Sequence, residues 1–168
     1  MYKFSKRIFD ITSSFIACII LAPILVPIII LLRLSSEGEI FYLQERIGMH
    51  NKPFMIFKFA TMLKNSSKMK GGIITVKNDP RVTFMGRFLR KSKLNELPQL
   101  INILMGNMSV VGPRPLMRVS FETYPSEIQK IIYNVKPGLT GIGSIVFRDE
   151  EELITNVKNI AIGVLTAD

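Results

Sequence analysis

The longest apolar run in the sequence lies near its N-terminus. Residues 11–32 contain no charged side chain, and a helix of that length, at about 1.5 Å per residue, reaches across the hydrocarbon core of a bilayer. Pro23 and Pro27 interrupt the run. Each proline removes a backbone donor and disfavours a straight helix. The pattern predicts an apolar helical segment that bends at Pro23.

Basic residues flank this apolar run on both sides. Lys3, Lys6 and Arg7 precede it and Arg33 follows it. Because Lys and Arg tend to stay on the cytoplasmic side, both flanks favour a re-entrant helical hairpin over a straight span. A buried core helix is the alternative, although a core helix rarely runs so long without a polar face. We also expect Asp10 to pair with Arg7 at the interface.

Two shorter patterns follow the apolar run. Residues 39–43 (EIFYL) and 54–59 (FMIFKF) are rich in aromatic residues and are bounded by turn residues, which predicts two strands that pair as a hairpin. Residues 82–94 alternate apolar and basic side chains at helical spacing. Such a basic amphipathic helix suits a membrane surface or a partner's groove.

The remaining segments predict short helices joined by rigid loops. Residues 95–105 (NELPQLINILM) carry a helix-start signature, with Asn95 as N-cap and Glu96 in the first turn. Residues 126–134 predict a further amphipathic helix, whereas 111–115 (VGPRP) and 135–143 are turn-rich loops. Residues 144–148 read as a strand, before the acidic run 149–152. The fold class is therefore α+β, mostly helical.

Charge and composition narrow the function. The chain has 22 basic and 13 acidic residues, and residues 52–93 hold eleven basic residues against Asp79 alone, a local net charge of +10. This suggests a polyanionic partner, such as nucleic acid, an anionic membrane or a phosphorylated substrate, and a merely solvated basic face is the open alternative. A 48% hydrophobic content argues against a disordered basic tail. Cys18 and His50 are each alone, which excludes a Cys/His zinc site and a Cys–His nucleophilic pair.

Taken together, several tracts resemble the bacterial sugar transferase family, the monotopic phosphoglycosyl transferases. The resemblance covers roughly residues 6–141, and its longest tract is the most specific. The tracts are KRIFD (6–10), the proline-broken apolar segment, QERIG (44–48), FKFATM (57–62), DPRVTFMGRFLRKSKLNELPQLINILMGNMSVVGPRP (79–115) and VKPGLTG (135–141).

The resemblance implies transfer of a sugar 1-phosphate from a nucleotide-diphosphate sugar, usually a UDP-sugar, to polyprenol phosphate, with release of UMP. It also implies a monotopic protein at the cytoplasmic face of the bacterial inner membrane. Residues 1–34 would form the membrane hairpin and residues 35–168 a small cytoplasmic catalytic domain with surface amphipathic helices. The implied partners are both substrates and membrane lipid. Nucleic acid is disfavoured, because no nucleic-acid motif is recognised and the apolar segment would be unexplained.

The resemblance also implies the site residues. Family members use an Asp–Glu pair, in which the Asp attacks phosphorus and the Glu helps to bind Mg²⁺; here the pair reads Asn95–Glu96. Arg114, Arg90 and Lys58 are the expected phosphate contacts. An amide has no anionic oxygen and is a very poor nucleophile toward phosphorus, so the covalent route is in doubt.

Three interpretations follow from Asn95. In the first, polyprenol phosphate attacks the donor directly, with Glu96 and Mg²⁺ organising the phosphates. In the second, another carboxylate is the nucleophile, for which the acidic run 149–152 is the candidate. In the third, the protein is an impaired or inactive member that acts as a membrane-bound binding or scaffold protein. Family members usually run several dozen residues further after the VKPGLTG tract, and residues 159–168 cannot be matched to their additional helices. We therefore expect a short C-terminus.

Overall fold

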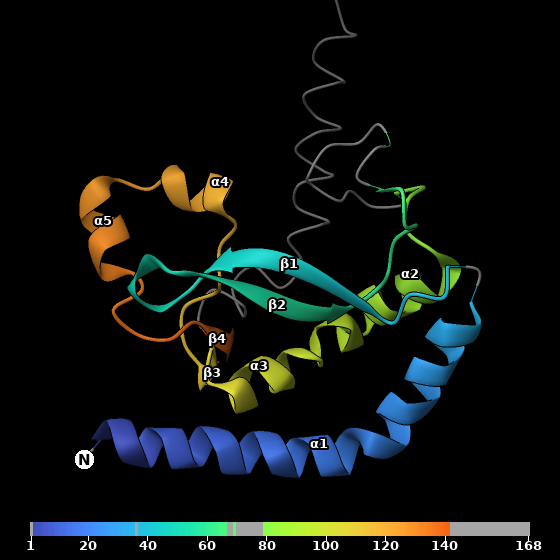
Figure 1. Ribbon diagram of the computed structural model, residues 1–168, viewed down its shortest axis with the longest axis horizontal. Helices are drawn as coiled ribbons and strands as arrows, with labels where there is room; N and C mark the ends of the chain where they lie inside the picture. Colours follow the sequence, from blue (N-terminus) through green and yellow to red (C-terminus); the bar gives the residue numbers. More distant parts are fainter. Residues whose placement is uncertain (1, 36, 67–68, 70–78, 142–168) are drawn as a thin grey trace, which may run out of the picture.

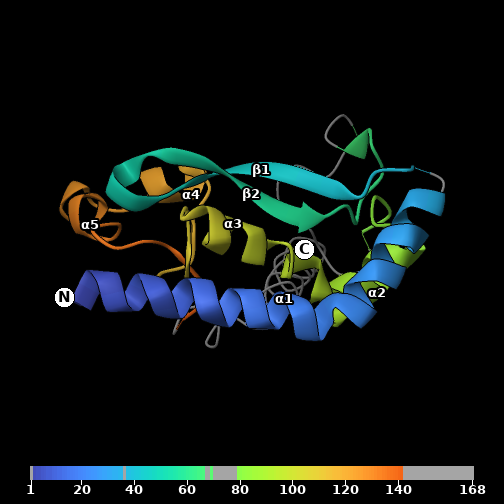
Figure 2. The same ribbon diagram turned by 60° about the horizontal axis from the view of Figure 1, so that its bottom comes forward.

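The computed structural model describes residues 2–35, 37–66, 69 and 79–141. Helix predominates over strand in this part of the chain, which agrees with the expected mixed class. The predicted strand at 144–148 and the acidic run 149–152 lie outside the described residues. Helix α3 (Gln99–Met105) lies between the hairpin of strands β1 (Phe41–Ile47) and β2 (Pro53–Phe59) and the long helix α1 (Tyr2–Leu34) in both views (Figures 1 and 2).

Helix α1 (Tyr2–Leu34) contains the apolar run and continues through Pro23 and Pro27. It changes direction between its two halves (Figures 1 and 2). By length and composition it is apolar enough to cross a membrane, and only 11% of its most apolar window is buried. Such exposure is unlike that of a core helix. The structure thus has one bent helix in place of two antiparallel ones, and the re-entrant hairpin stays a prediction.

A charged clamp holds the N-terminal half of α1 against the rest of the protein. The buried Asp10 carboxylate accepts hydrogen bonds from Lys6 Nζ at 2.7 Å, Ser109 Oγ at 3.0 Å and the Val110 N–H at 3.0 Å. The expected Asp10–Arg7 pair is wrong. Lys6 lies one helical turn before Asp10 on the same face, whereas Arg7 donates to the carbonyls of Ile103 and Leu104 at the end of α3.

Strands β1 (Phe41–Ile47) and β2 (Pro53–Phe59) form the predicted antiparallel hairpin, joined by the 3-10 turn η1 (Met49–Asn51). Helix α3 (Gln99–Met105) packs beneath β2. The buried Asn102 amide donates to the Met55 carbonyl at 2.8 Å and accepts from the Phe57 N–H at 2.9 Å. Asn102 therefore satisfies backbone groups of β2 that would otherwise lie unpaired at a sheet edge.

A parallel strand pair joins the start of the predicted loop 111–115 to the predicted loop 135–143, and neither strand was expected. Strand β3 (Ser109–Val111) pairs with β4 (Gly138–Thr140). A Cβ atom at Gly138 would collide with the backbone of Gly112. Glycine is thus required for this close backbone approach. The approach places residues 112–115, the GPRP loop, beside β4.

The basic stretch after the hairpin is divided between structural and exposed roles. Arg81 forms a buried ion pair with Asp79, in which the Nη2–Oδ2 distance is 2.6 Å. Helix α2 (Phe84–Lys91) is the predicted basic amphipathic helix; Leu89 packs against the second half of α1, whereas Phe84 is 86% exposed. An apolar ring so exposed, on a basic helix beside α1, suits a membrane interface.

Two short helices complete the described fold. Helix α4 (Arg118–Glu122) and helix α5 (Ser126–Ile131) lie beside the turn end of the β1–β2 hairpin (Figure 1). The expected helix at 126–134 is confirmed but ends earlier, at Ile131. Phe121 of α4 stacks on Tyr133, and both pack against Ile47 of β1. This cluster fixes the segment that follows the GPRP loop.

Candidate functional site

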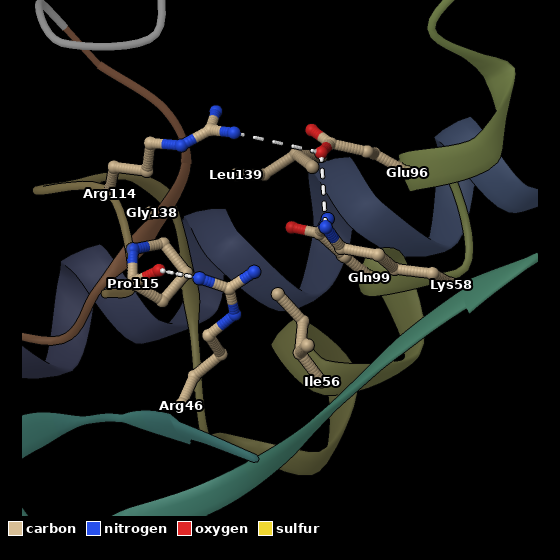
Figure 3. Close-up of a pocket in the computed structure, with 9 residues that line it drawn as sticks. All are labelled: Arg46, Ile56, Lys58, Glu96, Gln99, Arg114, Pro115, Gly138 and Leu139. Carbon is tan, nitrogen blue, oxygen red and sulfur yellow. Dashed lines mark hydrogen bonds and ion pairs between the residues drawn. The ribbon is translucent and has the colours of Figure 1, made fainter. Parts of the chain in front are cut away.

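A polar pocket opens where the hairpin, the start of α3 and the GPRP loop meet (Figure 3). Strands β1 and β2 form one wall, the 3-10 turn η3 (Leu94–Glu96) and α3 a second, and the GPRP loop with β4 a third. Segments far apart in the sequence therefore supply the site. The lining residues are Arg46, Ile56, Lys58, Glu96, Gln99, Arg114, Pro115, Gly138 and Leu139.

Glu96 is at the centre of the charged groups. Its Oε1 lies 3.4 Å from Lys58 Nζ and 4.0 Å from Arg114 Nη2. Burial alone would raise the pKa of Glu96, but the charges of Lys58 and Arg114 outweigh it and hold that pKa below the usual value. Glu96 is thus an ionised carboxylate, and no other acidic residue lines the pocket in the part of the chain that the structure describes.

Lys58 projects from β2 into the same pocket, and its side chain is only 17% exposed. Burial lowers the pKa of Lys58; Glu96 opposes the shift, whereas Arg46 and Arg114 add to it. Lys58 thus sits in an environment with more positive charge than its one carboxylate partner offsets. An incoming anion would relieve that imbalance.

Arg114 is held by its backbone while its guanidinium stays accessible. The Tyr133 hydroxyl donates to the Arg114 carbonyl at 2.8 Å and accepts from the Leu116 N–H at 2.8 Å. Pro113 and Pro115 fix φ on either side. The Arg114 side chain is 41% exposed. A guanidinium carried by a rigid loop suits the bidentate binding of phosphate oxygens.

Two lining residues were missed from the sequence. Arg46 and Gln99 both point into the pocket (Figure 3). Arg46 was visible in the QERIG tract, at the alternate position to Gln44 on one face of β1. Gln99 is a polar residue in the apolar stripe of residues 95–105, and it is buried, 3% exposed. For Gln99, a polar side chain on a buried face was the signal that would have found it.

Asn95 does not cap a helix, so that expectation is wrong. Residues 94–96 form η3, and α3 begins only at Gln99, with Pro98 as its N-cap. Pro98 has no N–H to donate, so the segment before it closes as a tighter 3-10 turn. The Oδ1 atom of Asn95 is buried, with no hydrogen-bond partner among the described residues. Asn95 is adjacent to Glu96 but is not among the residues lining the pocket.

The structure brings together three of the five predicted site residues, Lys58, Glu96 and Arg114. Arg90 lies on α2, half-buried, outside the lining of this pocket. Its positive charge contributes to the lowered pKa of Asp79, after the larger effects of Arg81. Whether Arg90 also contacts phosphate stays a prediction.

The donor set fits a magnesium ion that is shared with a substrate. In the part of the chain that the structure describes, no three His, Cys, Asp or Glu side chains come together as a metal cluster. Mg²⁺ commonly takes one or two carboxylates and completes its shell with phosphate oxygens and water. Glu96 can supply that one carboxylate. The pocket therefore suits a metal that arrives with a diphosphate.

The sequence was compared with known proteins. The model of the bacterial sugar transferase family matches residues 1–161. The UDP-glucose:undecaprenyl-phosphate glucose-1-phosphate transferase of Klebsiella pneumoniae is 43% identical over 144 residues, which cover 83% of this chain and 30% of that protein. The UDP-N-acetylgalactosamine-undecaprenyl-phosphate N-acetylgalactosaminephosphotransferase of Aeromonas hydrophila is 37% identical over 148 residues, 87% of this chain and 35% of that protein.

A third relative is nearer in length. The exopolysaccharide production protein ExoY of Sinorhizobium fredii is 36% identical over 167 residues, which cover 91% of this chain and 74% of that protein. This chain thus spans about a third of the Aeromonas protein and about three quarters of ExoY. All three similarities extend across the elements that form the pocket.

Proposed function

Because this chain belongs to the bacterial sugar transferase family, we propose that it transfers a sugar 1-phosphate from a nucleotide-diphosphate sugar to polyprenol phosphate and releases UMP. The observation that carries the proposal is the gathering of Lys58, Arg114 and Glu96 in one pocket. Two cations there can bind phosphate and one carboxylate can bind metal. The names of the relatives favour a UDP-sugar donor and undecaprenyl phosphate as acceptor.

The proposed reaction is a direct phosphoryl transfer, in which the protein positions the substrates and forms no covalent intermediate with them. An oxygen of polyprenol phosphate forms a bond to the sugar-bearing phosphorus, and the bond from that phosphorus to the bridging oxygen of UMP breaks. Lys58 and Arg114 hold the donor's diphosphate and stabilise the charge that develops on it. Asn95 would donate a hydrogen bond to one phosphate. This direct route requires no carboxylate nucleophile at residue 95.

Magnesium is part of the proposal. Glu96 is the residue that would hold it, and the ion would neutralise the diphosphate and the departing UMP. Glu96 is now paired with Lys58 and Arg114. With these two cations bound to the phosphates, the Glu96 carboxylate would be available to hold the metal.

The decisive experiment measures UMP. The detergent-solubilised protein is incubated with undecaprenyl phosphate, Mg²⁺ and a panel of UDP-sugars, and released UMP is quantified. Release that depends on both the acceptor and one donor supports the proposal. If no donor yields UMP, the enzymatic proposal is wrong.

An impaired or inactive member that serves as a membrane-bound binding or scaffold protein is the second candidate. The observation that favours it is Asn95, whose amide offers no anionic oxygen for attack on phosphorus. The variant Asn95→Asp separates the two candidates. We expect a gain in UMP release of about 100-fold or more if the covalent route is restored, and Asn107→Asp, outside the pocket, is the matched control. An unchanged rate would exclude the amide as the limiting group.

We also propose that α1 enters the inner membrane from the cytoplasmic face and returns to it. Support comes from the bend within α1, its exposed apolar surface and the basic residues at both ends. Single cysteines placed near Lys3 and near Gly38, in a Cys18→Ser background, can be labelled in intact spheroplasts with an impermeant maleimide. Protection at both ends is expected. Labelling of the N-terminus from the periplasm would rule out the re-entrant arrangement.

A further inference from the structure

We propose that Arg46 is a phosphate-binding residue of this pocket, a third cation that contacts a phosphate group of the substrates alongside Lys58 and Arg114. The inference rests on the proposed function, which it deepens. It starts from a cation that the fold places in the pocket without a carboxylate of its own.

The guanidinium of Arg46 has only neutral hydrogen-bond partners. Its Nη2 donates to Gln44 Oε1 at 2.6 Å, and its Nη1 makes a long contact of 3.4 Å with the Pro115 carbonyl. Its Nε is buried and has no hydrogen-bond partner among the described residues. A buried donor without a partner costs roughly 1–3 kcal/mol. Such a group is retained more readily where a ligand completes it.

The charges around Arg46 also favour an anionic ligand. Among the described residues that line the pocket, three are basic, Arg46, Lys58 and Arg114, and one is acidic, Glu96. Burial lowers the pKa of Arg46, and the neighbouring positive charge of Arg114 lowers it further. Basic side chains thus outnumber acidic ones among the described residues that line the pocket, which favours an anionic ligand such as a phosphate group.

The acid next to Arg46 in sequence does not neutralise it. Successive side chains of a strand point to opposite faces, and Glu45 lies 3.8 Å from Arg118 Nη2 of helix α4. Both members of that pair are 57% exposed. Arg118 is therefore a matched control, since it is also an arginine close to β1 but is not among the residues that line the pocket.

Arg46 is also preorganised. The next residue, Ile47, donates from its N–H to the Leu116 carbonyl at 2.9 Å, which ties β1 to the segment after the GPRP loop. Gln44, which accepts from Arg46, is itself within 3.4 Å of Met117 Sδ. The positions of Arg46 and Arg114 are thus coupled through a rigid backbone. A guanidinium held in this way loses little freedom on binding a phosphate.

The test compares Arg46→Met, Arg46→Lys and Arg118→Met in the full chain in detergent. Binding of UDP is measured by calorimetry, and stabilisation by farnesyl phosphate is measured as the rise in melting temperature. We expect Arg46→Met to weaken UDP binding at least tenfold and Arg46→Lys to weaken it less, because charge remains without the planar fork. Arg118→Met should stay within twofold of wild type.

The two probes separate the sources of the phosphate. Loss of UDP affinity in Arg46→Met assigns the residue to the donor's diphosphate. Loss of stabilisation by farnesyl phosphate, with UDP binding intact, assigns it to the acceptor. If Arg46→Met binds both probes as wild type does, the proposal is overturned.

The melting temperature without ligand distinguishes a binding role from a structural one. A cation without a carboxylate partner destabilises the empty pocket, so Arg46→Met should melt at the wild-type temperature or higher. A lower melting temperature with unchanged binding of both probes would show a structural role and overturn the proposal. Wild-type protein that binds UDP but releases no UMP would refute the proposed enzymatic activity, while the role of Arg46 would still be read from binding.

Discussion

The charged cluster around Asp10 and the charged cluster in the pocket differ in how short and complete their hydrogen bonds are. In the clamp at the N-terminal half of α1, Asp10 accepts three hydrogen bonds, from Lys6, Ser109 and Val110, at 2.7–3.0 Å. In the pocket, Glu96 meets its cations at 3.4 and 4.0 Å, and the Nε of Arg46 has no partner among the described residues. The Asp10 cluster is held by short hydrogen bonds, whereas the pocket keeps longer ion pairs and a buried donor without a partner among the described residues.

The difference separates charge that holds the fold from charge that serves a ligand. A buried carboxylate that accepts several short hydrogen bonds stabilises its surroundings, and removing it leaves several donors without an acceptor. The Lys58–Glu96 contact in the pocket is longer, at 3.4 Å, and contributes less to the stability of the empty protein. We therefore expect substitutions in the clamp to change stability and substitutions in the pocket to change binding and rate.

The largest expected effect is on rate. Glu96→Gln should reduce UMP release about 100-fold or more, because the pocket loses its carboxylate and with it the proposed metal ligand. The assay uses whichever of the wild-type and Asn95→Asp proteins releases more UMP, and Glu122→Gln on the exposed face of α4 is the control. The melting temperature should fall less than that of Asp10→Ala, because the Lys58–Glu96 contact is longer than the hydrogen bonds of Asp10. A drop as large as that caused by loss of Asp10 would erase the distinction between the clusters.

The second effect is on stability. Asp10→Ala should lower the free energy of unfolding by about 2–3 kcal/mol, because Ser109, the Val110 N–H and Lys6 all lose a charged acceptor. The change is measured as a shift in thermal melting in detergent, with exposed Glu127→Ala of α5 as control. UDP affinity at a temperature where the variant is folded should match wild type. A variant that melts normally but no longer binds UDP would place Asp10 in the binding function.

The smallest effect is a pH dependence in the pocket. Burial lowers the pKa of Lys58 below 10.5, so its charge is lost at a lower pH than that of a solvated lysine. UDP affinity should fall several-fold as pH rises through that lowered pKa, because one phosphate contact loses its charge. Calorimetry from pH 7 to pH 10 checks this, with Lys58→Arg as the variant whose charge persists. An equal decline in both proteins would assign the dependence to another group.

Stability should move in the opposite direction over the same range. Between the lowered pKa of folded Lys58 and its ordinary value of 10.5, the unfolded chain binds more protons, so the contribution of Lys58 to stability rises with pH. Glu96 acts at the acid end. Its stabilisation is complete above its ordinary pKa of 4.5 and is lost as pH falls through its lowered value.

Much of the architecture was predictable because local rules govern it. The apolar run and its prolines predicted a bent helix, and alternating aromatic residues predicted the β1–β2 hairpin. Lys58, Glu96 and Arg114 were identified as site residues from the resemblance, and the fold brings them into one pocket. The N-cap role of Asn95 failed because Pro98 delays the start of α3, a local effect that outweighed the capping preference.

What the sequence determined by itself was a bent apolar helix, a hairpin, a basic amphipathic helix and the chemical types available for binding phosphate. These follow from periodicity, proline and charge along neighbouring residues. Tertiary structure decided the partners. Asp10 bonds across α1 to Ser109, β3 meets β4, and Arg46 joins Lys58 and Arg114 only because the hairpin packs on α3 and the GPRP loop. Which charged groups have their hydrogen bonds satisfied within the protein depends on contacts between residues far apart in the chain, and no local pattern encodes those contacts.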